Sequence, residues 1–425
     1  MTREAQLPAA ALALAQAAVA QGEDAAGSAV AVAVSVAGQR FVADLGRTSR
    51  ARKVALAADA PGSTAKKAAW RDQVRPGVPV DAATRFDVAS LTKPMATLTL
   101  LAQALSHGGG PTPGIPLVSL DDPLERHLAE ARGCPIGKVR IGHLVSHASG
   151  LPAWRDFTDA ATAAEAKASP LDPPGRSRCA GVLAAVLATP LLHAPGTKAI
   201  YSDLGYLALG WLLESVYRTP IDDLFAGRVA APLGLRAGYR RLSDQPIADE
   251  AAVATEIIAA RCPDGRPLQG SVHDDNAALL DGVAGHAGLF ACSRDVLTWA
   301  EAWLDLLEPK ATDRDGDLAA GPLAIAPAIA RQLVASPGAP ASSWRHGWDT
   351  PSQPGSTAGA LAPPDTFGHL GFTGTSVWLS PGQRVAIVLL TNRVHPDRAR
   401  VAGIRALRPA LHDALWNGLV PCESR

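Results

Sequence analysis

Strand-like segments lie near both ends of this chain, and a long helix-rich block separates them. Residues 28–36 alternate alanine and valine, and residues 40–45 follow after a glycine-containing turn, which predicts a β-hairpin. Near the other end, residues 375–379 and 385–390 are apolar and are separated by a Pro-Gly turn, which predicts two more strands. Both ends of the chain are therefore expected to contribute to one sheet.

Segments with helical periodicity occupy the middle of the chain, and Pro and Gly residues separate them. They cover residues 95–105, 139–147, 180–187, 204–217 and 221–231. After a short strand at 289–292, two further helices are predicted at 294–307 and 400–419. This layout predicts an α/β (α+β) fold, with a largely antiparallel sheet flanked by helices and an inserted, mainly helical lobe.

The chain of 425 residues is long enough for one large domain or two lobes. We expect a single domain over 1–425, with an α/β lobe of about 1–95 and 270–425, a helical lobe of about 96–269, and a cleft where they meet. Stretches rich in Ala, Pro and Gly predict loops, and the last two are of low complexity. They cover residues 49–82, 156–178, 308–322 and 336–366.

Charge and cysteine usage exclude several classes of function. The chain has 40 Lys and Arg residues against 40 Asp and Glu residues, so it lacks the positive charge expected of a protein that binds nucleic acid or an anionic membrane. Its five cysteines are scattered without C-x-x-C spacing, which argues against a disulfide framework or a zinc knuckle. Neither a phosphate-binding loop nor a dinucleotide fingerprint occurs, so we expect no cofactor and no metal.

The N-terminal segment 7–20 is rich in Ala and Leu, and its end, Ala-Val-Ala at 18–20, is similar to a signal-peptidase site. Glu4 neutralises Arg3, however, and glutamines interrupt the apolar run, as in a surface helix. No segment reaches the length that spanning a bilayer requires. We therefore expect a retained helix and a cytoplasmic protein, with export as the alternative.

The stretch Phe-Asp-Val-Ala-Ser-Leu-Thr-Lys-Pro, at 86–94, offers a nucleophile and its activator on one helical turn. Ser90 and Lys93 are three residues apart, a spacing that places two side chains on the same face of a helix. Because proline is tolerated in the first turn, Pro94 predicts a helix that begins close to Ser90, with the hydroxyl near the positive end of the helix dipole. A serine hydroxyl attacks poorly unless a neighbouring group activates it, and Lys93 is placed to do so.

The S-x-x-K pattern alone is weak, because about one is expected by chance in a chain of this length. A second copy, at 63–66, follows a Pro-Gly pair with no apolar segment before it, which predicts a loop. The copy at Ser90 instead precedes the apolar helix predicted at 95–105. We therefore take Ser90 as the candidate nucleophile.

Two distant elements accompany Ser90 and Lys93. Residues 201–203, Tyr-Ser-Asp, open a predicted helix, and residues 369–371, His-Leu-Gly, precede an apolar strand. The order S-x-x-K, Y-x-[ND], [KH]-x-G resembles that of the serine hydrolases of the penicillin-binding protein and class C β-lactamase family, especially its esterase, D-aminopeptidase and D-alanyl-D-alanine carboxypeptidase-like branches. Further similar stretches extend the resemblance over nearly the whole chain, at 141–152, 195–196, 231–235, 272–277 and 282–290.

The resemblance implies that Ser90 forms an acyl-enzyme intermediate. It implies that Lys93 and Tyr201 share the proton transfer, with either one as the base, and the Lys93 ammonium is expected to lower the pKa of Tyr201 from its usual value near 10. An oxyanion hole is expected from the backbone N–H groups of Ser90 and Phe372. Gly371 lets the strand edge approach a bound substrate closely.

Two departures from the family pattern concern the substrate. Many lactamases and carboxypeptidases of this family have Lys-Thr-Gly, which helps to hold a substrate carboxylate, where this chain has His369, Leu370 and Gly371. A histidine is mostly neutral at pH 7 and leucine has no hydroxyl, so we expect weaker recognition of carboxylates. Asp203 stands where the family often has asparagine. Its charge is expected to raise the pKa of Lys93, to shift the base role toward Tyr201 and to favour substrates that carry an amine.

Other polar and aromatic residues are expected to be structural, packing in the core or bonding loop backbone. These are His143, His147, the His-Asp-Asp run at 273–275, Trp154 and Trp348. His286, in a glycine-rich turn, is as consistent with the border of the cleft as with a structural position.

These residues together predict a serine hydrolase that acts through an acyl-enzyme on a small-molecule or short peptide-like ester or amide, with D-aminoacyl substrates among the candidates. One alternative is a D-alanyl-D-alanine carboxypeptidase or class C-type β-lactamase, which uses the same chemistry. Another is a catalytically silent binding or scaffold protein. The complete set of Ser90, Lys93 and Tyr201 argues against the silent protein.

Overall fold

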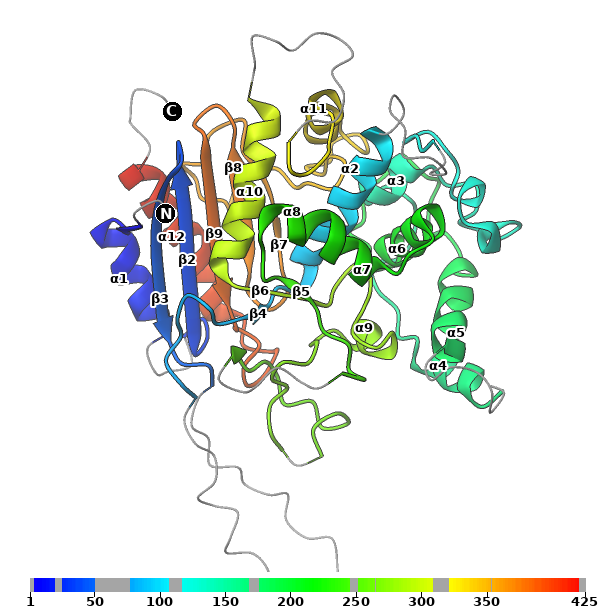
Figure 1. The fold of residues 1–425 in the computed structure, drawn as a ribbon, viewed down its shortest axis with the longest axis horizontal. Coiled ribbons are helices and arrows are strands. Elements are labelled where there is room, and N and C mark those ends of the chain that lie inside the picture. Colours follow the sequence, from blue (N-terminus) through cyan, green and yellow to red (C-terminus); the bar gives the residue numbers. More distant parts are fainter. Residues whose placement is uncertain are drawn as a thin grey trace, which may run out of the picture.

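The largest sheet of this protein has six strands in the order β1-β3-β2-β9-β8-β7 (Figure 1). The computed structural model describes residues 4–19, 25–49, 77–106, 117–167, 176–244, 251–263, 265–308, 321–352 and 354–419. The six strands are β1 (Ala5–Gln6), β2 (Ala29–Val36), β3 (Gln39–Gly46), β7 (Phe367–Leu370), β8 (Ser376–Ser380) and β9 (Val385–Thr391). All neighbouring pairs are antiparallel except β1 with β3. The largely antiparallel sheet, built from both ends of the chain, is confirmed.

Both faces of this sheet are covered, and the alternation of small and large apolar residues in β2 reflects the two coverings. Successive side chains of a strand point to opposite faces. The valines of β2 belong to the core formed with α1 (Ala9–Ala18) and α12 (Ala402–Leu419), whereas its alanines belong to the core that contains α10 (Ser293–Leu307). Figure 1 shows α1 and α12 on one side of the sheet and α10 on the other. Small alanines let α10 pack closely on this face.

The helix expected at 7–20 is present as α1 and packs against α12. Its residues Ala11, Ala15 and Ala18 are buried in the core that α1 shares with the valines of β2. Among the residues that the structure describes, no helix combines the length and hydropathy that crossing a membrane requires. The N-terminal helix is therefore a structural part of the sheet's outer layer.

The helical block lies beside the sheet, on the side of α10 (Figure 1). Its helices are α2 (Thr99–Ser106), α3 (Ile141–Val145), α4 (Thr158–Glu165), α5 (Arg176–Leu187), α6 (Asp203–Tyr217), α7 (Ile221–Phe225), α8 (Ala231–Leu233) and α9 (Asp275–Leu279), and α11 (Pro327–Ala335) packs on α2 and α10. A small three-stranded sheet, β4 (Phe86–Asp87), β6 (Leu289–Ala291) and β5 (Gly238–Tyr239), joins the block to the stretch before Ser90. All helices predicted from periodicity are present, while the division into two lobes near 95 and 270 stays a prediction.

Two predicted loops are partly wrong. The stretch 156–178 contains α4 and the start of α5, because Ala-rich sequence favours helix even where proline follows. The stretch 336–366, predicted as a low-complexity loop, contains the fully buried Trp348, whose ring packs on Trp299 and Trp303. Trp348 is a core residue, as expected. Most of the loops predicted at 49–82 and 308–322, and the second S-x-x-K copy at 63–66, lie outside the described residues.

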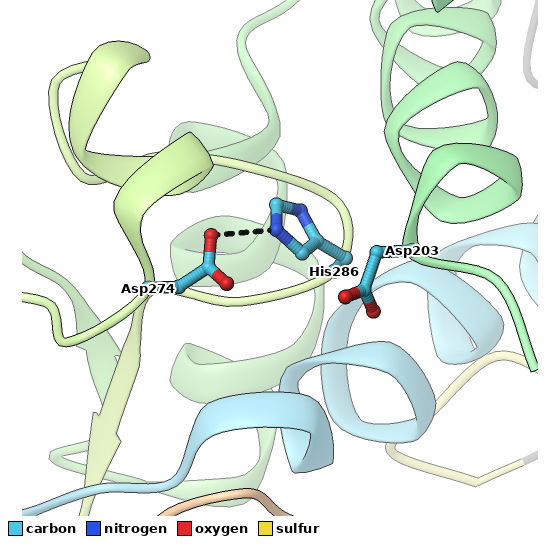
Figure 2. Close-up of side chains that lie close together, drawn as sticks. All are labelled: Asp203, Asp274 and His286. Atoms are coloured by element: carbon cyan, nitrogen blue, oxygen red, sulfur yellow. Dashed lines mark hydrogen bonds and ion pairs between the residues drawn. The ribbon is translucent and has the colours of Figure 1, made fainter. Parts of the chain in front are cut away.

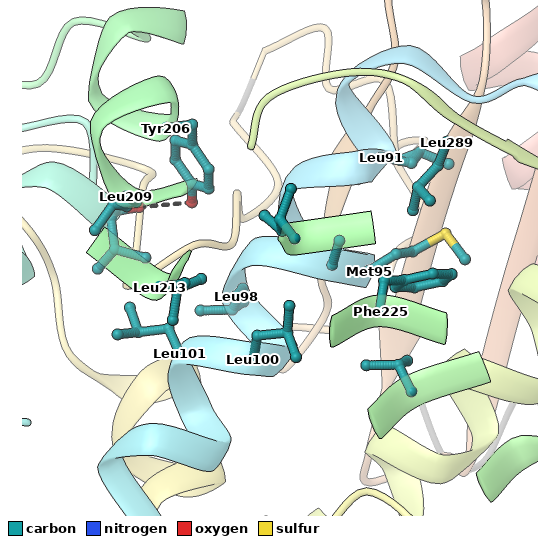
Figure 3. Close-up of a cluster of buried hydrophobic side chains, with 14 of the residues drawn as sticks. Leu91, Met95, Leu98, Leu100, Leu101, Tyr206, Leu209, Leu213, Phe225 and Leu289 are labelled. Carbon is teal, nitrogen blue, oxygen red and sulfur yellow. Dashed lines mark hydrogen bonds between the residues drawn. The ribbon is translucent and has the colours of Figure 1, made fainter. Parts of the chain in front are cut away.

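The helix predicted at 95–105 is not α-helical throughout. Residues Lys93–Leu98 form a π-helical turn that leads into α2. Thr99 Oγ1 donates a hydrogen bond to Pro94 O at 2.9 Å and accepts bonds from the indole N–H groups of Trp299 and Trp303. Figure 3 shows apolar side chains of this segment packing on those of α6 and α7. Single π-helical turns occur often at functional sites, and this one begins three residues after Ser90.

Candidate active site

Ser90 and Lys93 lie where the chain enters the helical block. Ser90 belongs to a 3₁₀ turn (Ala89–Leu91), and Lys93 begins the π-helical turn. Lys93 Nζ donates a hydrogen bond to Ser90 Oγ at 2.8 Å, and the Lys93 side chain is fully buried. The contact expected from the three-residue spacing is present, although the turn between the two residues is not a regular α-helix.

Asp87 fixes the backbone just before the serine. Its carboxylate accepts hydrogen bonds from the backbone N–H groups of Ala89 at 2.8 Å and His273 at 2.7 Å. Ala89 has a φ of 49°, in the left-handed region that is unfavourable for a residue with a Cβ. Such a conformation persists only where neighbouring contacts hold it, so the contacts of Asp87 help to position Ser90.

Tyr201 reaches the same point from the N-terminal end of α6. The next residue, Ser202, donates its backbone N–H to His147 Nδ1 at 3.0 Å and its Oγ–H to Pro152 O at 2.7 Å. The Tyr201 ring packs on the His147 ring with their centroids 4.4 Å apart, and Lys93 Nζ lies 4.7 Å from the Tyr201 centroid. His147 therefore has a structural role: it holds the turn that carries Tyr201.

Asp203 provides the counter-charge of Lys93. Its Oδ1 lies 2.7 Å from Lys93 Nζ, and it is the first residue of α6, where a negative charge is favoured by the helix dipole. Burial lowers the pKa of the Lys93 ammonium, but the charge of Asp203, with a smaller contribution from Tyr201, outweighs burial and raises the pKa above its usual value. This is the direction expected from the sequence.

Tyr201 does not have the lowered pKa that was expected from its neighbour. Burial is the largest single cause and raises the pKa of the phenol; the Lys93 ammonium and hydrogen bonds with Lys93 and Ser90 lower it, and the charge of Asp203 raises it. The net pKa of Tyr201 is above its usual value near 10. Lys93 and Tyr201 thus both hold their protons at neutral pH, and one of them must lose its proton before it can accept the serine proton.

The hairpin of β7 and β8 forms the wall that faces Tyr201. His369 lies inside β7, opposite Val377, and its buried ring donates from Nδ1 to Leu370 O at 2.7 Å. Burial, with the charge of Lys93, lowers the pKa of His369 to about 3, so the imidazole is neutral at pH 7. Its Nε2 is buried and has no hydrogen-bond partner among the described residues. His369 therefore offers a hydrogen-bond acceptor where a lysine would offer a charged donor.

Two threonines after β7 hydrogen-bond to the backbone just before Ser90. Thr373 Oγ1 donates to Asp87 O at 2.7 Å, and Thr375 Oγ1 donates to Val88 O at 3.0 Å. A Cβ on Gly371 would lie 2.0 Å from Thr375 Oγ1 and 2.6 Å from Val88 O, so only glycine fits between the hairpin and the turn. Gly371 thus lets the hairpin contact the backbone before Ser90 closely, while its close approach to a bound substrate stays a prediction.

The backbone N–H groups of Ser90 and Phe372 flank this junction. Within the described ranges, neither of them donates to a protein acceptor. Backbone donors of this kind are available to a developing oxyanion. Phe372 is 50% exposed, and both Ser90 and Phe372 line the same cavity.

One cavity of about 830 Å³ collects these groups. Its lining contains every site residue expected from the sequence except the fully buried Lys93, namely Ser90, Tyr201, Asp203, His369, Gly371 and Phe372. Trp154 also lines the cavity and is 48% exposed, so of the two structural positions expected for it, packing in the core is wrong. Three distant parts of the chain therefore converge on one accessible space.

Comparison with known proteins identifies the family. The beta-lactamase family model matches residues 14–412, which is nearly the whole chain. The chain belongs to the beta-lactamase family. Together with the serine, lysine and tyrosine at this site, that membership makes it a serine hydrolase.

Related proteins agree with the fold of this beta-lactamase-family chain. A protein named “Putative D-alanyl-D-alanine carboxypeptidase” from Salmonella agona (strain SL483) is 28% identical over 334 residues, which cover 73% of this chain and 70% of that protein. A penicillin-binding protein homologue from Caulobacter crescentus has a TM-score of 0.62 at 18% identity and covers 97% of this chain and 99% of its own. EstCE1, described as a hydrolase with promiscuous acyltransferase activity, has a TM-score of 0.61 at 20% identity and covers 96% of this chain and 97% of its own.

The beta-lactamase-family site also includes residues that were expected to be structural or for which two positions were equally consistent with the sequence. Asp274 Oδ1 lies 2.8 Å from His286 Nε2, and both lie near Asp203 (Figure 2). These three side chains offer ligand atoms within 4.8 Å of one another, but Lys93 Nζ already places a cation at Asp203. We therefore infer that these three side chains balance the charge around Lys93 and do not bind a metal.

Two other cavity residues were not expected at the site. Trp344 lies in a stretch predicted as a low-complexity loop, yet its ring packs 5.3 Å from that of Tyr201. His273, which was expected to be structural, lines the cavity, stacks on the Phe372 ring at 5.7 Å and shares a hydrogen bond of 2.8 Å with Glu256. Its only sequence signal was its position in the stretch 272–277, which is part of the family resemblance.

Proposed function

We propose that this chain hydrolyses an ester or amide through an acyl-enzyme formed on Ser90. The observation that carries the proposal is the 2.8 Å hydrogen bond between Lys93 Nζ and Ser90 Oγ at the wall of an accessible cavity that Tyr201 shares. A buried ammonium next to a serine hydroxyl, with a phenol beside both, is the arrangement that nucleophilic catalysis by serine needs. A catalytically silent protein has no need to keep the Lys93 ammonium buried.

In the proposed reaction, Ser90 Oγ bonds to the substrate carbonyl carbon while the pair of Lys93 and Tyr201, having lost one proton, accepts the serine proton. The carbonyl oxygen becomes an oxyanion that accepts hydrogen bonds from the backbone N–H groups of Ser90 and Phe372. The bond to the leaving alcohol or amine then breaks, and the proton passes from the pair to that leaving group. Water attacks the acyl-enzyme in the same way, and Ser90 regains its proton as the acid is released.

Two substrate classes have specific support. The fold shared with EstCE1, described as a hydrolase with acyltransferase activity, supports a small ester. The similarity to a protein named as a D-alanyl-D-alanine carboxypeptidase supports a short peptide-like amide as the second candidate. The sequence predicted that Asp203 favours a substrate that carries an amine. The structure gives this prediction little support, because the Asp203 carboxylate is already paired with Lys93.

We also propose that the enzyme acts in the cytoplasm with its N-terminal helix retained. The burial of Ala11 and Ala15 against α12 supports this proposal, because cleavage near residue 20 would remove α1 and expose apolar residues of the sheet. The intact mass of the protein isolated from its native host tests this proposal. A mass that lacks the first twenty residues would contradict it.

The test of the catalytic proposal is the Ser90→Ala variant. We expect the wild-type protein to gain one adduct mass with a fluorophosphonate probe and to hydrolyse p-nitrophenyl esters. The Ser90→Ala variant should show no adduct and a kcat lower by about 10⁴-fold or more, since the group that forms the covalent bond is gone. Ser63→Ala removes the serine of the other S-x-x-K copy and is the matched control, expected to react like wild type. Labelling that survives Ser90→Ala would overturn the proposal.

A further inference from the structure

Two arginines bond to the carbonyl groups on either side of the Phe372 backbone nitrogen. Arg408, on α12, donates from one terminal nitrogen to Gly371 O at 2.9 Å and to Thr375 O at 2.7 Å. Arg393 donates from Nε to Phe372 O at 2.7 Å. The N–H of Phe372 is one of the two expected oxyanion donors, and both carbonyls that flank it therefore bond to a guanidinium group.

The Gly371 carbonyl and the Phe372 N–H belong to one peptide unit. This peptide bond is trans, so its C=O and its N–H point in opposite directions. Arg408 therefore bonds to the unit on the side away from the N–H. Hydrogen bonds in a chain polarise one another, and those made by a charged donor are the stronger ones. A guanidinium on the carbonyl oxygen thus makes the N–H of the same unit a stronger donor.

The hydrogen bonds of both guanidinium groups end on neutral oxygens. Arg393 makes its other bond to Arg398 O, at 2.7 Å, so its acceptors are carbonyls, as are those of Arg408. The Nε of Arg408 is buried and has no partner among the described residues. Burial, with the nearby charge of Arg393, lowers the pKa of Arg408 to about 10, which still leaves it charged at pH 7. A partly desolvated charge is costly, and here its compensation comes from backbone carbonyls beside Phe372.

The side chain of Phe372 is held as well. Its ring centroid lies 4.3 Å from the guanidinium carbon of Arg393 and 5.7 Å from the stacked ring of His273. The backbone N–H of His273 donates at 2.7 Å to Asp87, whose carboxylate also fixes the turn before Ser90. Contacts that start at one expected oxyanion donor therefore lead to the other.

We propose that Arg408 and Arg393 are positioning residues of the oxyanion hole, and that Arg408 polarises the Gly371–Phe372 peptide so that its N–H binds the oxyanion more strongly. Donors of an oxyanion hole are effective because they are fixed in advance where negative charge develops. The charge of Arg408 acts through the peptide and requires no contact with the substrate. This inference rests on the proposed function, because it concerns the transition state of the same site.

Nuclear magnetic resonance tests the polarisation without any reaction. Phe372 is the only phenylalanine of the chain that follows a glycine. Protein labelled with ¹³C at glycine carbonyls and ¹⁵N in phenylalanine therefore gives a single HNCO cross-peak, from the Gly371–Phe372 peptide. We expect its amide-proton and carbonyl-carbon resonances to move upfield in Arg408→Met, because the charge-assisted bond to the carbonyl is lost.

Two further variants complete this measurement. Arg408→Gln loses the charge but keeps an amide donor, so the cross-peak should move in the same direction by less. Arg132→Met removes an exposed arginine of the helical block and is the matched control, expected to leave the cross-peak in place. Circular dichroism verifies that each variant folds. A cross-peak that stays in place in the folded Arg408 variants would overturn the polarisation.

A kinetic comparison tests the effect on the reaction. Phenyl acetate and its thionoester differ only in the carbonyl atom, and sulfur is the weaker hydrogen-bond acceptor. The ratio of kcat/KM for ester over thionoester therefore reports on hydrogen bonds to the oxyanion. Removing one oxyanion donor outright costs about 10²- to 10³-fold in kcat, so weakening one should cost less. We expect kcat/KM for phenyl acetate to fall about ten-fold in Arg408→Met and in Arg393→Met, with the ratio falling in both.

The outcomes separate this inference from the proposed function. A variant that merely contains less folded protein lowers both rates equally and leaves the ratio unchanged. If both substrates depend on Ser90 and the ratio is the same in wild type, Arg408→Met and Arg393→Met, the arginines do not act on the oxyanion hole, while the hydrolase stands. If neither substrate depends on Ser90, the proposed function fails, and the inference fails with it because no oxyanion forms at this peptide.

Discussion

Lys93 and Arg408 are two cations at the same cavity, and they differ in what neutralises them. Lys93 is fully buried and pairs with the Asp203 carboxylate at 2.7 Å. Arg408 is held by two neutral carbonyl oxygens and has no carboxylate partner in the described part of the chain. The protein therefore balances the charge next to its nucleophile with a carboxylate, whereas it holds the Arg408 charge with carbonyl oxygens alone.

The largest expected effect comes from removing the internally balanced cation. Lys93→Met should lower kcat/KM by about 10³-fold, since a group that takes part in proton transfer at the nucleophile is lost. The loss should be equal for phenyl acetate and its thionoester, because Lys93 acts on the serine hydroxyl and not on the carbonyl oxygen. Steady-state kinetics on both substrates measures this, with the exposed Lys138→Met as the control. A selective loss for the oxygen ester would place Lys93 in oxyanion stabilisation and remove the contrast with Arg408.

A smaller effect is expected from neutralising the partner of Lys93. The charge of Asp203 raises the pKa of both Lys93 and Tyr201, so Asp203→Asn should lower both. Wild-type kcat/KM should rise with pH above neutrality, since the base must lose a proton whose pKa is raised. In Asp203→Asn this rise should move to lower pH by about 1 to 3 pH units, whichever residue is the base. The pH–rate profile measures this, with the exposed Asp121→Asn as the control. An unmoved profile would show that the Asp203 charge does not act on the base.

The smallest expected effect is that of salt. Exposed charges are screened when ionic strength rises, whereas a buried ion pair is screened much less. Raising NaCl from about 0.05 M to about 0.5 M should therefore leave kcat/KM for neutral esters nearly unchanged, because the Lys93–Asp203 pair is buried. The same salt series on kcat for neutral esters reports on Lys93 and should be flat. A steep fall of kcat with salt would argue that the charge of Lys93 is exposed to solvent during the reaction.

Much of the fold and of the reacting groups was predictable, because local patterns encode them. The alternation in β2 and the period of α6 and α10 depend on neighbours in sequence and on which face is buried. The three-residue spacing places Ser90 and Lys93 on the same face of a helical turn. Their side chains therefore form a hydrogen bond although the turn is 3₁₀ and π-helical and not α-helical. The first strand, β1, pairs through only two residues and left no pattern to detect.

What the sequence by itself determined was the set of groups that can react: a serine three residues before a lysine, with a tyrosine and a glycine strand edge in a set order. Only the tertiary structure decided their protonation and their surroundings. Burial, which no local pattern encodes, raises the pKa of Tyr201 against the pull of Lys93. The packing of α12 against the sheet brings Arg408 to the carbonyl of Gly371 across 37 residues of sequence, a contact that no local pattern encodes.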